Sequence, residues 1–85
     1  METNLLKGYK TSHVPLAAYL RMNGAQLIRV TCEGRRGVFE FDICHREHII
    51  EFNNGQARVE PGEFAEKMSQ LTQTAKRVMN EQGDK

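Results

Sequence analysis

The 85-residue sequence has few cysteines, almost no excess of charge and no long apolar run. Two cysteines are too few for a disulfide-stabilised scaffold. Twelve basic and eleven acidic residues give a net charge of +1, which argues against non-specific wrapping of a polyanion. No run of about 18 apolar residues is present, so no membrane-spanning helix is expected. Residues 1–7 are too polar for a signal peptide, and we therefore expect a cytoplasmic protein.

Motifs that indicate catalysis are also missing. The sequence has no glycine-rich phosphate loop, no carboxylate pair suited to acid–base chemistry and no Ser-His-Asp arrangement. We therefore expect a protein that is not an enzyme and needs no cofactor. A chain of this length forms one domain, which we predict at residues 9–81, after a flexible lead-in at 1–8 and before a polar tail at 82–85.

What the sequence does contain is a β-hairpin over residues 26–42. Its two arms, residues 26–32 and 37–42, are rich in the β-branched and aromatic residues that suit a pleated sheet. Between the arms, Gly34 and Gly37 can supply the positive φ angles of a tight reversal. This hairpin is the element around which we expect the rest of the chain to be organised.

Alternation of side chains predicts an apolar face and a mixed face for this hairpin. Phe39 and Phe41 point to the same side of the second arm. In the first arm the predicted faces are Ile28, Val30 and Cys32 on one side, and Leu27, Arg29 and Thr31 on the other. Because a lone hairpin is marginally stable in water, we expect helices to cover its apolar side.

One helix is predicted before the hairpin and one after it. The first spans residues 12–23, with Ser12 as its N-cap and Asn23 followed by glycine as its stop. The second spans residues 43–52, with Asp42 as its N-cap and another Asn-Gly pair after its end. The glycines suit the left-handed conformation that often ends a helix.

A third helix begins at Pro61 and is the clearest periodic segment of the sequence. Its apolar residues recur at steps of four and three, at Phe64, Met68, Leu71, Ala75 and Val78. Short strands are predicted at residues 9–11 and 56–59. The predicted fold is therefore α+β, in the order β-α-β-β-α-β-α, with a small antiparallel sheet built on the central hairpin and covered on one face by helices.

Several of these segments together resemble a known family. The residues that carry the resemblance are Lys10-Thr11-Ser12, Leu16 to Leu20, Val38 to Asp42, Asn54-Gly55, Ala57 to Pro61 and Phe64. They match the pattern K-T-S, small helix, F-x-F, N-G, R-V-x-P-x-x-F of a small bacterial and phage-associated domain family of unknown function. The resemblance implies a fold and an origin in bacterial or mobile-element genomes, but no activity. The chain departs from this family after Asp42, where Cys44-His45-Arg46 replaces an acidic helix start.

A group of cysteine and histidine residues is the first candidate site. Thiolate and imidazole are the usual ligands of zinc, and Cys44, His45 and His48 lie close together in the sequence, with Cys32 on the hairpin. Their spacing matches no known zinc motif, so we predict no metal site and keep these residues as weak candidates. Cys44 could also pair with His48 or His13 as a nucleophile, but no third group marks such a site.

Basic residues form the second candidate site. Arg35 and Arg36 lie at the predicted hairpin tip, Arg29 lies on the mixed face, and Lys10 and Arg58 are expected nearby. The planar guanidinium of arginine binds two phosphate oxygens at once, so these residues can contact nucleic acid. The alternative is a solvated turn on a protein whose charges balance.

The last helix is the third candidate, through Leu71, Val78 and Met79. A helix of this length is about as long as the whole domain, at about 1.5 Å per residue, so its apolar end can overhang and bind a partner. Our first hypothesis is a small non-enzymatic adaptor that binds a protein partner or itself through this helix and a sheet edge. The alternative is a nucleic-acid-binding accessory protein of a bacterial or mobile-element system.

Overall fold

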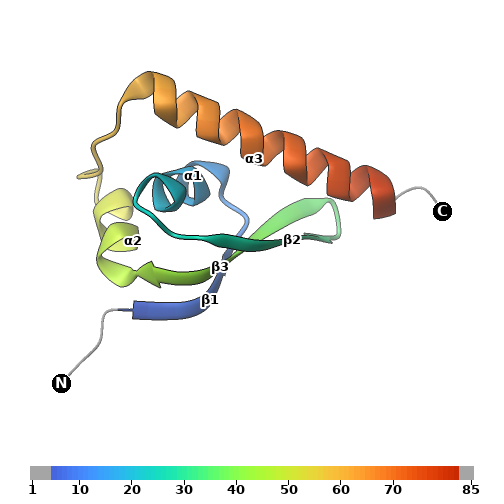
Figure 1. Ribbon diagram of the computed structural model, residues 1–85, viewed down its shortest axis with the longest axis horizontal. Coiled ribbons are helices and arrows are strands. Elements are labelled where there is room, and N and C mark those ends of the chain that lie inside the picture. The colour runs from blue at the N-terminus through green and yellow to red at the C-terminus, as the bar shows by residue number, and fades with distance from the viewer. Residues whose placement is uncertain (1–4, 83–85) are drawn as a thin grey trace.

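The computed structural model describes residues 5–82, which form a three-stranded antiparallel sheet and three helices (Figure 1). The strands are β1 (Leu5–Thr11), β2 (Leu27–Glu33) and β3 (Arg36–His45), in the spatial order β1-β3-β2. The helices are α1 (Val14–Met22), α2 (Arg46–Asn53) and α3 (Pro61–Gln82). In Figure 1, α1 lies between the sheet and α3, and α2 follows the end of β3. The predicted α+β class is confirmed.

β2 and β3 form the predicted hairpin with a two-residue turn. Glu33 pairs with Arg36, so Gly34 and Arg35 make the reversal. Gly34 has a φ of +66°, and positive φ at the first turn residue alone is the pattern of a type II′ turn. Gly37, the second predicted turn glycine, lies inside β3, where a side chain would clash with α3. A Cβ atom there would lie 2.8 Å from a Cβ atom of α3, so strand and helix approach very closely.

The register of β2 against β3 corrects one predicted face. Leu27 lies opposite Phe41, and Arg29 lies opposite Glu40. Residues directly opposite each other share a face, so Leu27 faces the core, and the prediction that placed it beside Arg29 is wrong. The cause is a register shift between Leu27 and Arg29, which makes a β-bulge at Ile28. The bulge leaves the Ile28 side chain 51% exposed.

β3 continues to His45, beyond the predicted end of the hairpin. Asp42 was predicted to cap a helix, but it lies within β3, and its N–H donates to the Gln26 carbonyl at 2.9 Å. α2 begins only at Arg46, with His45 in the N-cap position and no side-chain cap bond. Cys44 is therefore on a strand. The strand is longer than predicted because β1 pairs with it as far as His45.

β1 begins at Leu5, earlier than the predicted start at Tyr9, so residues 5–8 of the predicted lead-in belong to the sheet. Residues 1–4 of the lead-in and 83–85 of the predicted tail lie outside the described residues. The short strand predicted at residues 56–59 is absent from the described structure, and this segment joins α2 to α3. The other elements follow the predicted order.

α1 begins later than predicted. Its first residue is Val14, and His13 rather than Ser12 occupies the N-cap position. The Thr11 hydroxyl, not that of Ser12, accepts a hydrogen bond from the backbone N–H of His13, at 3.1 Å. Pro15 lies in the first turn, where its missing N–H leaves no helical bond unmade.

The predicted ends of α1 and α2 are confirmed. Gly24 and Gly55 follow the two helices with φ angles of +95° and +73°. The N–H of Ala25 donates to the carbonyl of Leu20 at 3.0 Å, which is the long bond of a Schellman motif, and the equivalent bond after α2 is 2.8 Å long. Both stops therefore depend on glycine in the left-handed region.

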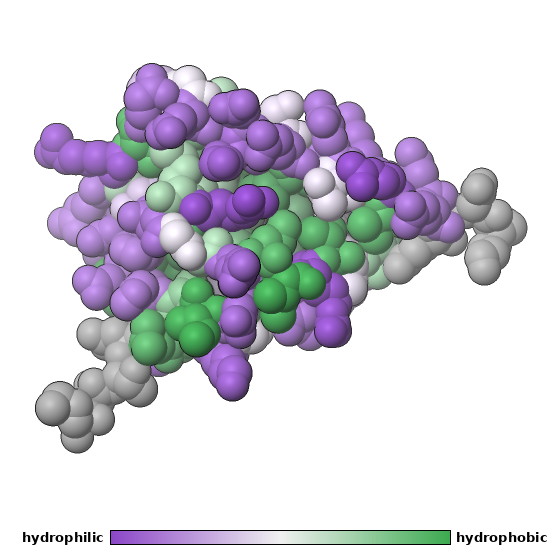
Figure 2. Space-filling view, in the orientation of Figure 1, coloured by the Kyte–Doolittle hydropathy of each residue, from purple (hydrophilic) through white to green (hydrophobic). Residues whose placement is uncertain are grey.

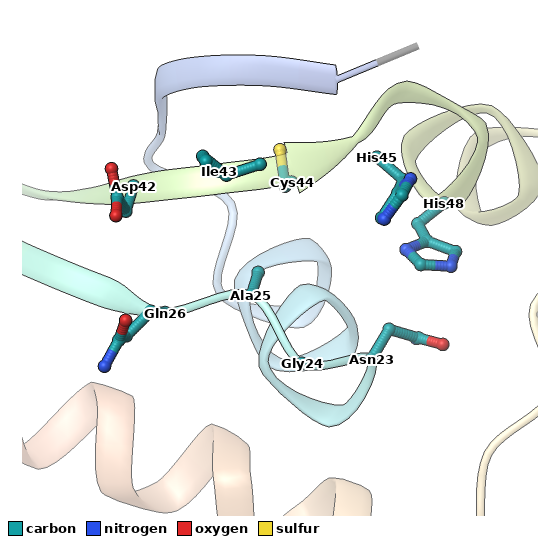
Figure 3. Close-up of a pocket in the computed structure, with 9 residues that line it drawn as sticks. All are labelled: Asn23, Gly24, Ala25, Gln26, Asp42, Ile43, Cys44, His45 and His48. Carbon is teal, nitrogen blue, oxygen red and sulfur yellow. The ribbon is translucent and has the colours of Figure 1, made fainter.

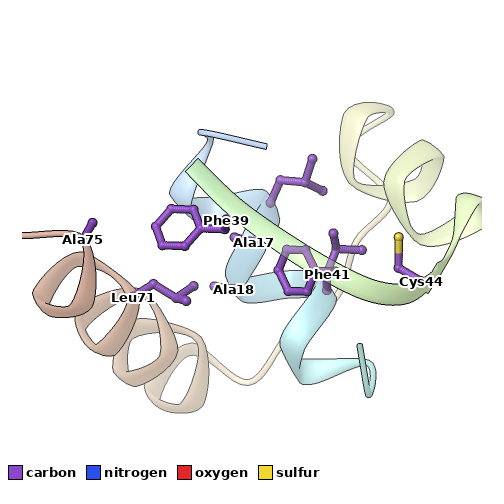
Figure 4. Packing of buried hydrophobic residues seen from close by; sticks show 9 residues of the cluster. Ala17, Ala18, Phe39, Phe41, Cys44, Leu71 and Ala75 are labelled. Carbon is purple, nitrogen blue, oxygen red and sulfur yellow. The ribbon is translucent and has the colours of Figure 1, made fainter. Parts of the chain in front are cut away.

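The hydrophobic core lies between one face of the sheet and the helices (Figure 4). Phe39 and Phe41 are 1% and 0% exposed, as the alternation predicts. The buried cluster also contains Leu16, Ala17, Ala18, Leu20, Cys44, Leu71 and Ala75. Burial of one large apolar side chain stabilises a fold by about 1.5–3 kcal/mol, so this face of the hairpin supplies much of the folding free energy.

Candidate functional site

The face of the sheet that turns away from the helices carries a row of charges across its three strands. Lys10 on β1 lies opposite Glu40 on β3, and Glu40 lies opposite Arg29 on β2. Arg29 Nη1 is 3.8 Å from Glu40 Oε1. The signs therefore alternate across the sheet, and both outer strands end the row with a positive charge. We call this surface the outer face, and within residues 5–82 no helix covers it (Figure 1).

Apolar side chains are also exposed on the outer face. The burial pattern of β3 changes after Phe41, because the next fully buried residue is Cys44 rather than Ile43. Ile43 is 45% exposed and lies opposite Lys7 on β1. On β1, Gly8 follows Lys7 and has a φ of +72°. The regular alternation of side chains between the two faces of the sheet is therefore broken at the same place in both strands. Figure 2 shows the resulting mixture of apolar and hydrophilic surface along the lower side of the molecule.

β1 is an edge strand, and it forms the lower boundary of the described structure in Figure 1. Its six paired residues share one register against β3, with Gly8 left out of the ladder, whereas the register of β2, at the other edge, shifts at its bulge. α3 packs against β2 and β3. Alternate N–H and C=O groups of an edge strand point away from the sheet and form a template for a further strand. β1 is therefore the more regular and the more accessible of the two edges.

The five basic residues of the nucleic-acid hypothesis are Lys10, Arg29, Arg35, Arg36 and Arg58. Arg35 and Arg36 are exposed at the hairpin turn. Arg58 lies in the connection between α2 and α3, at the opposite end of the molecule from that turn (Figure 1). On the sheet, the acidic Glu40 separates Lys10 from Arg29. The structure therefore does not bring the five residues into one basic patch.

The apolar stripe of α3 packs against the sheet. Leu71 is 1% exposed and lies inside the core, where a partner does not reach it. Met79 is partly buried against the same core, and Val78 is partly buried. Of the three residues predicted to bind a partner, Leu71 is therefore a core residue, and the helix offers less apolar surface than expected.

A cleft of about 290 Å³ lies between the end of β3 and the connection from α1 to β2 (Figure 3). Its lining residues are Asn23, Gly24, Ala25, Gln26, Asp42, Ile43, Cys44, His45 and His48. The rings of His45 and His48 are in edge contact, with centroids 5.3 Å apart. The sequence did not predict this cleft because its two sides come from segments far apart in the chain, one interpreted as a helix end and turn, and the other as a helix start with weak candidate metal ligands.

The cysteines are not arranged as metal ligands or nucleophiles. Cys44 is 2% exposed, and burial raises the pKa of its thiol above the ordinary value of 9.0, which disfavours the reactive thiolate. Its sulfur points away from the His45 and His48 rings (Figure 3). Cys32 donates to the Gly34 carbonyl at 3.2 Å. Among residues 5–82, no group of three or more His, Cys, Asp or Glu side chains is placed to hold a metal ion.

A model of one protein family matches residues 7–78, and the description of that family is "Domain of unknown function (DUF5659)". The chain belongs to this family. The matched span includes every described helix and strand except the ends of β1 and α3. The resemblance to a family of unknown function is thus confirmed, and the association with phage or mobile elements stays a prediction. No curated protein and no solved structure matches the chain.

One further finding concerns the length and polarity of the helices. No helix within residues 5–82 is both long enough and apolar enough to cross a membrane. α3 is the longest of them, and its outward side is polar, with an acidic residue, Glu63, in its first turn.

Proposed function

We propose that this domain is a non-enzymatic interaction module, and that it binds an extended segment of a protein partner along the edge of β1. The observation that carries the proposal is an accessible edge strand that pairs with β3 in one register on both sides of Gly8, beside an outer face that no described helix covers. In strand addition, backbone hydrogen bonds provide affinity and alternate side chains provide specificity. β1 offers both, because charged and apolar side chains flank its edge.

The proposal moves the binding surface from the last helix to the sheet. Leu71 and Ala75 are buried in the core, and Phe64, Met68 and Met79 pack against it. A helix whose apolar stripe is occupied in this way has little left for a partner. The predicted sheet edge is the half of the original hypothesis that the geometry supports.

Nucleic-acid binding is the second candidate, because Arg35 and Arg36 are both exposed at the hairpin turn. Two arginines can bind one phosphate group, but binding of a long polyanion requires a continuous row of basic side chains. Here Glu40 interrupts the row of cations on the outer face, and the net charge of the chain is only +1. These charges favour the protein-binding proposal.

Selection of short random peptides on the immobilised domain, followed by amide hydrogen exchange of the complex, tests the proposal. Strand addition protects alternate amides of β1, namely those that do not bond to β3. We expect selected peptides to slow exchange at alternate positions between Tyr9 and Thr11, where the strand is regular after Gly8. Failure to select any peptide, or protection on α3 instead of β1, would overturn the proposal.

Gel shifts with single- and double-stranded DNA and RNA at two salt concentrations test the second candidate. The proposal expects no stable complex. A complex that weakens steeply with salt and is lost in the double variant Arg35→Ala, Arg36→Ala would support nucleic-acid binding instead. Arg58→Ala is the matched control, because it removes one arginine at the other end of the molecule.

A further inference from the structure

We infer that the segment bound by β1 has acidic side chains on one face and apolar side chains on the other, in the order acidic, apolar, any, acidic, apolar. This inference rests on the proposed strand addition at β1 and adds the chemistry of the partner. The order follows from which side chains β1 presents on each face, read for an antiparallel added strand.

β1 presents cations on the outer face and apolar groups on the inner face, both with a spacing of three residues. Lys7 and Lys10 are exposed, whereas Leu6 and Tyr9 are partly buried against the core. A regular strand repeats every two residues, but Gly8 with its φ of +72° adds one step between the two pairs. A neighbouring strand must therefore place matching side chains three residues apart.

The ammonium groups of Lys7 and Lys10 have no charged partner among the described residues. Within the described part of the chain, neither Lys7 nor Lys10 forms an ion pair or a side-chain hydrogen bond. Lys10 lies opposite Glu40, whose carboxylate pairs with Arg29 on its other side. Directly opposed charges of unlike sign stabilise a sheet, and like charges destabilise it. An acidic residue beside Lys10 continues the alternating row across a fourth strand.

The neighbour that β1 already has follows the same rule at Tyr9 and Lys10. On β3, the acidic Glu40 lies opposite Lys10, and the apolar Phe41 lies opposite Tyr9, whereas Lys7 lies opposite the apolar Ile43 and has no acidic partner there. The same side chains, Lys10 and Tyr9, also lie beside the edge of β1 that faces away from β3. A partner segment with acidic and apolar residues in these places would make the same kinds of contact from that side.

A second copy of this chain does not meet the requirement through β1. The strand reads Leu-Leu-Lys-Gly-Tyr-Lys-Thr and contains no acidic residue. Antiparallel pairing of two such strands leaves the lysines opposite uncharged residues or opposite each other, and the latter arrangement is repulsive. Charge complementarity therefore favours a different protein as the partner.

A titration with two synthetic peptides tests the inference. The peptide T-E-V-T-E-I-T has the inferred order, and T-K-V-T-K-I-T reverses its charges. We expect the acidic peptide to shift the backbone NMR signals of β1 and to bind about tenfold more tightly than the basic one, given two opposed charge pairs. Equal binding of the two peptides at β1 would overturn the inference and leave the proposed function intact.

Charge exchange in the protein gives the matching control. In the double variant Lys7→Glu, Lys10→Glu, the preference should reverse, so that the basic peptide binds more tightly. If this variant is unfolded, Lys7→Gln with Lys10→Gln should bind both peptides equally while keeping the fold. Arg58→Glu, in the connection between α2 and α3 and outside the sheet, should leave the preference of the unaltered domain unchanged.

The remaining outcomes are distinguishable. If library-selected peptides bind β1 but the acidic peptide does not, the inference fails and the proposed function stands. If no peptide of either kind binds β1, the proposed function fails as well. If sedimentation shows a dimer that Lys10→Glu strengthens, a second copy is the occupant and the inference is overturned.

Discussion

The two faces of the sheet are made by the same three strands, but they are built for different purposes. On the inner face, Phe39 and Phe41 are almost completely buried beneath α1 and α3. On the outer face, the exposed Lys10 and Arg29 flank the partly buried Glu40 in a row of alternating charge. Adjacent residues of one strand therefore either pack in the core or lie at the surface, according to which way they point.

This comparison shows how a domain of this size can leave one face of its sheet without a helix over it. A chain of this length buries only about 60–65% of its unfolded surface and has modest stability. The helices pack on one face of the sheet, and the other face needs few side-chain contacts to keep the three strands paired. Substitutions should then cost much on the inner face and little on the outer face.

The largest expected effect comes from truncating the centre of the inner face. Phe41→Ala should lower the free energy of unfolding by about 3–5 kcal/mol, because it removes a fully buried ring and leaves a cavity. Ile43→Ala, two residues further along the same strand, should cost less than about 1 kcal/mol, because Ile43 is half exposed. Urea denaturation measures both, and similar losses in the two variants would contradict the division into faces.

A smaller effect is expected where β3 touches α3. Gly37→Ala should cost about 1–3 kcal/mol, because the new Cβ would lie 2.8 Å from that of Ala75. Ala75→Gly alone should cost about 1 kcal/mol of helix propensity. In the double variant the clash is gone, so the combined loss should be smaller than the sum. Additive losses in a thermal or urea cycle would show that the two residues do not touch.

High pH should lower the free energy of unfolding, through titratable groups that are buried on the helix side of the sheet. Burial raises the pKa of the Cys44 thiol above 9.0, and burial followed by the hydrogen bond to Glu51 raises the pKa of Tyr19 above 10.0. The folded state keeps these protons when the unfolded state has lost them, so stability is full below these values and falls as the pH rises through them. Burial raises the pKa of Tyr9 in the same direction.

The urea midpoint, measured from about pH 7 to about pH 11, checks this expectation. Cys44→Ala should remove the part of the decline that begins near the thiol's ordinary value of 9.0, and Tyr19→Phe the part that begins near 10.0. A midpoint that stays constant over this range in the unaltered protein would show that these groups titrate alike in both states.

The smallest effect is expected on the outer face. Arg29→Ala removes the ion pair with Glu40, but Arg29 is largely exposed and the pair is screened by water. The free energy of unfolding should change by less than about 1 kcal/mol. A loss as large as that of Phe41→Ala in the same urea experiment would mean that the outer face is part of the stabilising core.

The sequence predicts features that depend on local chemistry. Phe39 and Phe41 follow the strict alternation of a half-buried strand, and the Asn-Gly pairs stop two helices through the left-handed conformation of Gly24 and Gly55. α3 begins at Pro61 as its capping signals indicate, with Glu60 accepting a hydrogen bond from the N–H of Glu63 at 2.7 Å.

Features that depend on pairing between distant segments were missed. The bulge at Ile28 and the change of facing at Gly8 have no local signal, because each is set by the strand alongside. Asp42 has the chemistry of a helix cap, but it lies within β3, because its N–H bonds to Gln26 and the residues after it, as far as His45, pair with β1. The candidate site depends on those pairings, so only its members, and not their arrangement, were predictable.

Amide hydrogen exchange of the protein without any partner measures whether β1 is an open edge. We predict slow exchange throughout the middle of β3, at Phe39 to Phe41, which is paired on both sides, and alternating slow and fast exchange on β1 from Tyr9 to Thr11. Uniformly slow exchange from Tyr9 to Thr11 would contradict the proposed strand addition, since it would mean that this edge is already covered.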